Sequence, residues 1–380
     1  MKKIWNWCKA EIVLCIAIIL AVTSSFFVRP DKEYFEYIDL KTLVLLFCLM
    51  AVMAGLQKIG LFQYVAERML EKVHHIRGIV FILIALCFVS SMFITNDVAL
   101  ITFVPFAFSV LHIILKEDAK KMVVPVVVMQ TIGANLGSML TPIGNPQNLY
   151  LYGKTDMGFG DFMLFMLPYT AMAFLILVIW CLCFPYKGEK QFTISLEQPT
   201  SMKGRGKELV GYVVLFALCV LTVANIVPCS ITCLVVVIVV FLLDKKVFGK
   251  VDYSLLFTFV GFFIFVGNMG RIPAFNQMLK DVIEGNEVLT AVLSSQFMSN
   301  VPAALLLSGF TEKYDLLIVG TNLGGLGTLI ASMASLISFK YIGKEYKSLR
   351  GKYFLYFTIA NLLFLAIFLL CTLTIFIKIS

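Results

Sequence analysis

Two short polar segments interrupt long apolar stretches of this chain, Thr95-Asn96-Asp97 and Ser299-Asn300-Val301. Ser, Thr and Asn are favoured at helix N-caps, and the proline at Pro302 suits a first helical turn. A helix that begins in the middle of a membrane directs the positive end of its dipole there and attracts anions. The amide and hydroxyl oxygens of the same residues are suitable ligands for a small cation such as Na+. These segments therefore predict a site for an anion and a cation.

A second polar pair lies downstream of the first. Residues 133–145 align without gaps on residues 320–332, with six of 13 positions identical. Paired polar breaks at corresponding places in two halves are the best sequence indication of the central site of a secondary transporter. The shared glycines allow helices to unwind or to approach closely, and small-residue helix packing alone would also explain them. Asn135 and Asn322 occupy equal places in both copies and must be hydrogen-bonded if they are buried.

The two halves are not equivalent. Asp97 has Val301 as its counterpart, and the segment from Asn145 to Asn148 aligns with the segment from Ser332 to Ser335. A charge at the bilayer centre costs about 2.5–3.5 kcal/mol on insertion scales, so an intramembrane acid is a functional hypothesis by default. The alternative is that Asp97 only completes the N-terminus of its own helix. We predict that the first half carries the stronger polar site.

These patterns divide the candidate site residues into two groups. The residues expected to bind substrate are Asn96, Thr141, Asn145, Asn148, Asn300 and Thr328. The residues expected to couple an ion are Thr95, Asp97, Asn135, Ser299 and Asn322, with Thr95 and Ser299 also capping the hairpin arms. Apart from a possible Na+, no cofactor or metal is expected.

The composition places these segments in a membrane. Of 380 residues, 60% are apolar and 14% are charged, and several apolar runs reach the roughly 20 residues that a spanning helix needs. We expect an all-α polytopic protein with nine spans, at 10–28, 39–57, 122–140, 162–184, 208–226, 230–243, 253–269, 314–339 and 353–377. Residues 77–114 and 288–311 are interpreted as re-entrant hairpins, because a full span would bury each polar tripeptide unpaired. The alternative is two ordinary short spans in each stretch.

Basic residues set the orientation. With the N-terminus in the cytoplasm and the C-terminus outside, 23 of the 31 Lys and Arg lie inside, as the positive-inside rule requires. The net charge of +8 therefore indicates topology in a cytoplasmic membrane and gives no reason to expect nucleic acid. The first span resembles a signal peptide, but it is long enough to cross and is expected to be retained.

The repeat divides the chain at a polar cytoplasmic linker. The expected units are an N-terminal half at 1–184, the linker at 185–207 and a C-terminal half at 208–380. The matching spans 39–57 and 253–269 are five crossings apart, and an odd offset forces opposite orientations. The halves are therefore predicted to be inverted repeats, each with a hairpin and a broken transmembrane helix. The first hairpin would enter from the cytoplasmic side and the second from the external side.

Other chemistry finds no support in the sequence. The ten cysteines are scattered through the spans without metal-ligand spacing and are read as small buried apolar residues. No nucleotide-binding loop is present, so ATP hydrolysis is not expected. No paired acid and base or activated nucleophile appears, so we do not expect an enzyme.

At the polar motifs the chain resembles the ion transporter superfamily, which includes divalent anion/sodium symporters, arsenite permeases, NhaD-type sodium/proton antiporters and citrate–metal permeases. Residues 94–100 resemble the first-hairpin signature, residues 299–304 resemble the second, and residues 141–148 resemble a Thr-x-x-Gly-x-Pro-x-Asn element. The likeness covers roughly residues 39–377 and is closest to small bacterial permeases of the citrate-transporter-like group.

The resemblance implies several properties. In the symporters, Ser-Asn-Thr triplets at both hairpin tips bind carboxylate and sodium, whereas the third position here is Asp97 or Val301. Asp97 would repel a dianion unless it is protonated or paired. The resemblance also implies a scaffold and a transport domain in each protomer, often as a homodimer.

We therefore expect a secondary active transporter that moves a small anion, coupled to Na+ or H+, by alternating access. The alternatives are a cation/proton antiporter, in which Asp97 titrates during exchange, and an arsenite-type efflux permease for a neutral solute.

Overall fold

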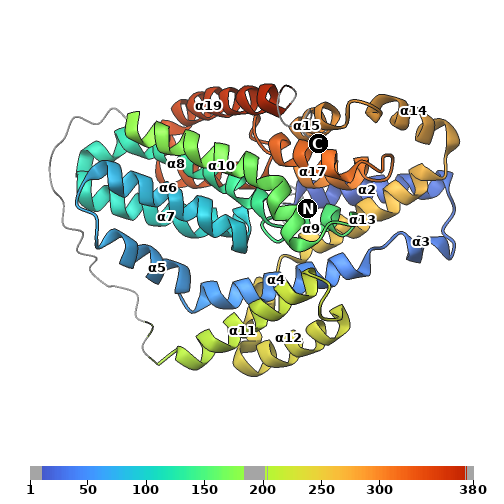
Figure 1. Cartoon of the computed structure of the whole chain (residues 1–380), viewed down its shortest axis with the longest axis horizontal. Coiled ribbons are helices and arrows are strands. Elements are labelled where there is room, and N and C mark those ends of the chain that lie inside the picture. Colours follow the sequence, from blue (N-terminus) through green and yellow to red (C-terminus); the bar gives the residue numbers. More distant parts are fainter. Residues whose placement is uncertain (1–10, 184–201, 203, 373, 375–380) are drawn as a thin grey trace, which may run out of the picture.

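The structure is a computed structural model that describes residues 11–183, 202, 204–372 and 374. Within these ranges every regular element is a helix (Figure 1), as the composition predicts for an all-α polytopic membrane protein. The expected linker at 185–207 and both ends of the chain lie largely outside the described residues.

The helices of the first half follow in chain order. They are α2 (Ile12–Phe27), α3 (Glu33–Glu36), α4 (Leu40–Lys58), α5 (Leu61–Leu70), α6 (Ile76–Ile94), α7 (Asn96–Leu115), the 3-10 helix η1 (Lys116–Asp118), α8 (Ala119–Gly137), the 3-10 helix η2 (Ser138–Leu140), α9 (Pro146–Tyr152) and α10 (Phe159–Cys183).

The second half repeats much of this order. Its helices are α11 (Gly206–Val223), α12 (Cys229–Asp244), the 3-10 helix η3 (Lys245–Lys250), α13 (Tyr253–Gly270), α14 (Pro273–Ile283), α15 (Glu287–Met298), α16 (Asn300–Leu307), α17 (Tyr314–Gly324), α18 (Met333–Glu345), the 3-10 helix η4 (Lys347–Leu349) and α19 (Arg350–Cys371).

Eight helices in the described part of the chain are long and apolar enough to cross a membrane. They include both arms of the first predicted hairpin, α6 with 19 residues and α7 with 20, so by length each arm can reach across. The arms of the second hairpin are shorter, with 12 residues in α15 and eight in α16. A hairpin and a pair of crossings both return the chain to the same side, so the charge map is the same for either.

The span predicted at 314–339 contains the break that is expected from the sequence in each half. Residues 314–339 do not form a continuous helix, because α17 ends at Gly324 and α18 begins at Met333. In the first half, α8 likewise stays helical through Gly133 and Gly137, and its break covers only the residues between α8 and α9. The glycines shared by both copies, Gly133, Gly137, Gly320 and Gly324, therefore lie in the helices before the breaks, where they serve packing.

The packing role of these glycines is the same in both halves. A Cβ at Gly137 would lie 2.1 Å from the carbonyl oxygen of Phe88 and 2.7 Å from Ser91 Oγ on α6. A Cβ at Gly324 would lie 2.5 Å from Ser295 Oγ on α15. The first arm of each hairpin thus packs closely against the helix that precedes a break, which fixes the hairpin tip relative to that break.

Outer helices of one half pack against helices of the other half. Helix α2 packs on α13 and α12 packs on α4, which Figure 1 shows as two neighbouring pairs. Arg271 at the end of α13 pairs with Asp31 after α2 at 2.7 Å, and Lys58 at the end of α4 pairs with Asp244 at the end of α12. Lys58 and Arg271 are 213 residues apart, and so are Asp31 and Asp244. The two ion pairs are therefore equivalent contacts made in opposite directions.

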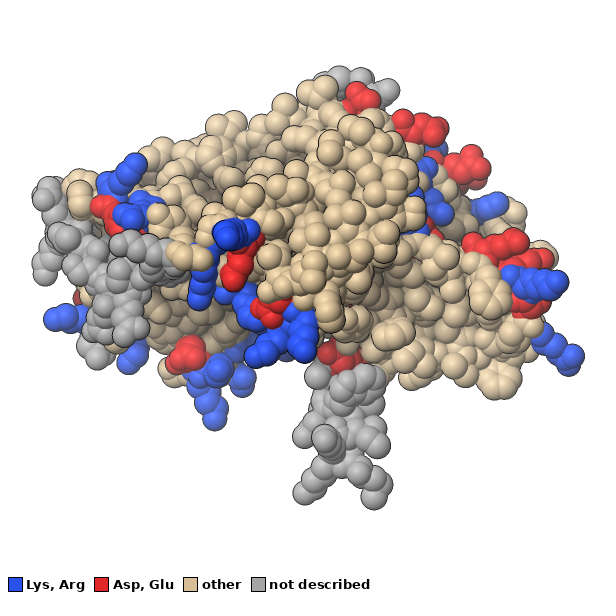
Figure 2. All heavy atoms as spheres, turned by 90° about the horizontal axis from the view of Figure 1, so that it is seen from below, with Lys and Arg blue, Asp and Glu red and all other residues tan. Residues whose placement is uncertain are grey.

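The surface agrees with a membrane location. Exposed large apolar side chains cover α10, α11, α12 and α19. In Figure 2, Lys and Arg gather over the left and centre of one face, many Asp and Glu lie at its right end, and a broad uncharged zone separates the two groups.

Candidate functional site

The first part of the site is a chain of hydrogen bonds that starts at the first hairpin tip. Asn96 Nδ2 donates to Asn135 Oδ1 at 3.0 Å, and Ser332 Oγ donates to the same oxygen at 3.0 Å. Asn135 Nδ2 donates to the carbonyl oxygen of Gly325 at 3.3 Å. All three side chains are at most 5% exposed. Asn135 therefore joins the first hairpin to the break of the second half.

The second part of the site joins the halves in the opposite direction. Asn145 Nδ2 donates to Asn322 Oδ1 at 3.0 Å, and Asn322 Nδ2 donates to Asn148 Oδ1 at 2.6 Å. In the alignment of residues 133–145 on 320–332, Asn135 matches Asn322 and Asn145 matches Ser332. Asn135 and Asn322, which match each other in the alignment, thus each accept at Oδ1 a hydrogen bond from the break of the other half. We call these five asparagines and Ser332 the amide network.

Three helices begin at this network, and a fourth, α16, begins beside it. Asn96 and Asn300 are the first residues of α7 and α16, and Asn145 and Ser332 directly precede α9 and α18. Four helices also end beside it, namely α6, α8, α15 and α17. The positive ends of the starting helices favour an anion, and free carbonyl oxygens at the ending helices favour a cation.

The predicted capping by Thr95 and Ser299 is wrong in its detail. Both residues precede their helices, but neither side chain accepts a capping hydrogen bond. Thr95 has φ 67° and ψ 149°, and Ser299 has φ 74° and ψ 155°, whereas a capping residue normally has a negative φ. At the second tip, Ser299 Oγ instead lies 3.4 Å from the carbonyl oxygen of Ala331, which also accepts from the backbone N–H of Asn300 at 2.9 Å.

The two threonines of the repeat hold the breaks to the hairpins. Thr141 Oγ1 donates to the carbonyl oxygen of Met92, and Thr328 Oγ1 donates to that of Gln296 at 3.1 Å. Both acceptors lie three residues before a tip. Thr328 is exposed and lies outside the amide network, whereas the carbonyl oxygen of Thr141 accepts from Asn148 Nδ2 at 3.3 Å. Both hydroxyls are thus engaged with main chain.

Three residues that help to hold the site together were not among the candidates from the sequence. Ser91 and Ser295 contact the glycines of α8 and α17, and the repeat around each tip reveals them, since Ser-Ser-x-Phe precedes both tips. Gln296 Nε2 donates to the carbonyl oxygens of Gly324 and Leu326, at 3.1 and 2.9 Å, and so clamps the second break. Gln296 corresponds to Met92, so no sequence symmetry indicated it.

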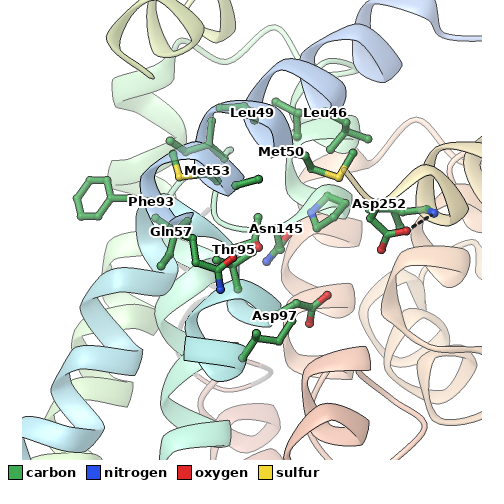
Figure 3. Close-up of a pocket in the computed structure, with 18 of the residues that line it drawn as sticks. Leu46, Leu49, Met50, Met53, Gln57, Phe93, Thr95, Asp97, Asn145 and Asp252 are labelled. Carbon is green, nitrogen blue, oxygen red and sulfur yellow. Dashed lines mark hydrogen bonds between the residues drawn. The ribbon is translucent and has the colours of Figure 1, made fainter. Parts of the chain in front are cut away.

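Asp97 lies beside the network and faces a cavity. This cavity of about 180 Å³ lies between α4, the first tip, the start of α9 and the start of α13, and most of its lining is apolar. Its charged residues are Asp97, Asp252 and Lys250. Asp97 Oδ1 is buried without a hydrogen-bond partner. In Figure 3 the carboxyl groups of Asp97 and Asp252 turn toward the same part of the cavity. No cluster of three or more metal-ligating side chains was found in the described part of the chain.

Comparison with known proteins identifies the class of protein that carries this site. Residues 4–312 match the profile of the citrate transporter family. The chain is 32% identical over 332 residues to the inner membrane protein YbiR of Escherichia coli, covering 86% of each protein. It is 32% identical over 313 residues to an uncharacterised transporter of Methanocaldococcus jannaschii, covering 81% of this chain and 82% of the relative.

A more distant relative is the silicon efflux transporter LSI3 of Oryza sativa, 27% identical over 162 residues, which are 43% of this chain and 32% of the rice protein. The family match and the two longer alignments span most of the helices that build the amide network. This chain is a multi-pass membrane transporter that belongs to the citrate transporter family.

Proposed function

We propose that this protein is a secondary active transporter that moves a small anion across the cytoplasmic membrane, coupled to Na+ or H+. The observation that carries the proposal is the convergence of four helix N-termini on one buried set of asparagines. A half-helix that begins at membrane depth supplies unpaired N–H groups and a positive dipole end without the cost of burying a lysine or arginine. Such a site can bind an anion and still release it.

The amide side chains would orient the anion. Asn96, Asn145, Asn148 and Asn300 each stand in the first turn of a helix or at its cap, where side-chain and backbone N–H groups are available to an anion. At present these amides bond to one another and to backbone groups. An anion would replace some of these bonds, which keeps the buried donors satisfied in both states.

The cation would bind near Asp97 and the carbonyl oxygens at the breaks. Asp97 is the carboxylate nearest to the first tip and has an unpartnered oxygen. The carbonyl oxygens of Gly325 and Ala331 lie beside the network and accept from Asn135 and Asn300. These groups fit a hard cation that prefers oxygen ligands, with Asn135, Asn322, Thr95 and Ser299 holding the surrounding backbone.

We further propose that the two halves are inverted repeats and that transport proceeds by alternating access. When two halves are related by a two-fold axis, their contacts come in matched pairs. If residue i of the first half contacts residue j of the second, then the equivalent of j in the first half contacts the equivalent of i in the second. The pairs Asn135–Ser332 and Asn322–Asn145 have this form, and so do the ion pairs of Arg271 and Lys58. The offset from α4 to α13 is five crossings, an odd number, so the two helices would have opposite orientations. The two-fold axis that relates the halves would then lie in the membrane plane.

The test is uptake of radiolabelled succinate, citrate, sulfate and phosphate into proteoliposomes, with and without an inward gradient of Na+ or H+. Gradient-dependent uptake of an anion that falls at least tenfold in Asn96→Ala and Asn300→Ala supports the proposal. Asn276→Ala is the matched control, because Asn276 lies on α14 and its side chain donates to the carbonyl oxygen of Gly270 at 2.8 Å, away from the amide network. Unchanged uptake in both site variants would place binding elsewhere.

One observation favours a second candidate, efflux of a small uncharged oxyacid. The amide network contains no lysine, arginine or histidine side chain, and hydroxyl groups of a neutral solute can exchange bonds with amides equally well. The rice relative is named as a silicon efflux transporter. Silicic acid or arsenous acid flux without any coupling-ion dependence, and without anion uptake, would select this candidate.

A further inference from the structure

The pseudo-equivalent residues Asp39 and Asp252 reveal a difference between the halves. They are 213 residues apart, the same offset that relates Lys58 to Arg271. Each caps its helix in the same way, because Asp39 Oδ1 accepts from the N–H of Thr42 and Asp252 Oδ1 accepts from the N–H of Leu255, both at 3.0 Å. The two caps have nearly identical backbone angles, φ −75° and ψ 85° against φ −79° and ψ 84°.

The second carboxylate oxygen distinguishes them. Asp39 Oδ2 accepts a hydrogen bond of 2.6 Å from the hydroxyl of Thr42. The equivalent position beside Asp252 is Leu255, which has no hydroxyl, so among the described residues no group donates to Asp252 Oδ2. Asp252 therefore keeps a free carboxylate oxygen at the wall of the cavity that Asp97 also lines.

The lining of this cavity contains one carboxylate from each half. Asp97 Oδ1 is buried without a partner, and Lys250 is the remaining charged residue of the lining. Gln57, Thr95 and Asn145 are neutral polar residues of the lining, on α4, at the first tip and at the start of α9. Asp252 is exposed to solvent and Asp97 is partly buried. Two carboxylates in the lining of one cavity repel each other unless a proton or another cation lies between them.

We propose that Asp97 and Asp252 jointly bind one small cation, Na+ or H+, and that this cation holds the first hairpin against the start of α13. The inference rests on the proposed cation coupling and assigns it a second residue. When the cation leaves, repulsion between the two carboxylates favours separation of the hairpin from α13. Cation release and movement of the hairpin are thereby coupled, because the same two groups control both.

The test uses purified protein in detergent and needs no substrate. Thermal unfolding is measured while Na+ replaces choline at constant ionic strength, at pH 8, and separately between pH 5.5 and 8 without Na+. A ligand that binds only the native state raises the midpoint, so the wild type should respond to Na+ or to protons. Asp97→Asn and Asp252→Asn should each raise the cation concentration needed for the same midpoint shift about tenfold or more, because each variant removes one negative charge that attracts the cation.

Asp39→Asn is the matched control. Asparagine caps a helix as well as aspartate does, so Asp39→Asn and Asp252→Asn perturb equivalent caps while only the second changes the cavity. A normal cation response in Asp252→Asn, or an equal loss in Asp39→Asn, would overturn the inference. Absence of any Na+ or pH response in the wild type would overturn it as well.

The inference and the proposed function fail separately. Anion uptake that persists unchanged in Asp252→Asn with an intact cation response would remove Asp252 from the site and leave the transporter proposal standing. A cation response that requires both carboxylates, in a protein that carries no anion, would support the cation site and reject the anion proposal.

Discussion

Substituting Gly137 tests whether the hairpin and the broken helix are held at a fixed distance. A Cβ at this position would lie 2.1 Å from the carbonyl oxygen and 2.8 Å from the carbonyl carbon of Phe88. Carbon atoms pack at about 3.5–4.0 Å, so α6 and α8 must separate by roughly 1 Å or more to admit the methyl group. Both obstructing atoms belong to the backbone and cannot rotate away.

The neighbouring glycine supplies the control. A Cβ at Gly133, one turn earlier on the same helix, would find its nearest atoms at 3.6 Å, which is ordinary contact. Alanine is about 1 kcal/mol better than glycine inside a helix, so Gly133→Ala should stabilise by up to that amount. Overpacking costs about 1–3 kcal/mol, so Gly137→Ala should destabilise. The gain in helix propensity applies to both variants and cancels, so the two should differ by the cost of overpacking, about 1–3 kcal/mol.

The assay is thermal unfolding of both variants in the same detergent, followed by uptake in proteoliposomes. We expect the midpoint to rise or stay level for Gly133→Ala and to fall for Gly137→Ala. Uptake should also fall in Gly137→Ala, because Asn135 and the first tip are positioned across this contact. Equal stability of the two variants would refute the reasoning that close backbone approach fixes the hairpin.

Three further predictions follow from single contacts. Asn322→Ala removes the partner of two buried asparagines and should cost about 1–3 kcal/mol for each amide left unsatisfied, together with most of the uptake, measured by thermal unfolding and flux. Lys58→Asp should lower the unfolding midpoint only slightly, since the pair with Asp244 is partly exposed, and adding Asp244→Lys should restore it; no recovery in the double variant would contradict this. Burial alone would raise the pKa of Glu287, but hydrogen bonds from backbone N–H groups and from Lys313, at 3.0 Å, lower it overall. Its ionised form therefore stabilises the protein at pH above the unfolded pKa, and this contribution is lost as pH falls through the lower folded pKa. Glu287→Gln should flatten the acid side of the stability profile, and an unchanged profile would refute the assignment.

The sequence alone was sufficient for the class of protein and the location of its polar breaks. Long apolar runs identify membrane helices because hydrocarbon leaves the backbone no other partner than itself. The alignment of residues 133–145 on 320–332 indicated Asn135 and Asn322 as candidate site residues, and both are buried at the centre of the amide network. Repetition is visible in sequence because equivalent places in two halves need equivalent residue types.

The contacts between the halves needed the tertiary structure. Nothing in the sequence indicated that Asn135 meets Ser332 while Asn145 meets Asn322, because both bonds join residues more than 170 positions apart. The capping expected of Thr95 and Ser299 failed because a positive φ directs their side chains elsewhere, and residue type does not reveal φ.

Asp252 is a second example of a residue whose place near the site could not be predicted from the sequence. Its sequence context predicts an ordinary N-cap, and it is one, as is Asp39. Only the tertiary structure places Asp252, at the start of α13, in the lining of the cavity that Asp97 also lines. Local pattern determines which residues can bind ions and where helices begin, and the association of distant helices decides which of those residues meet.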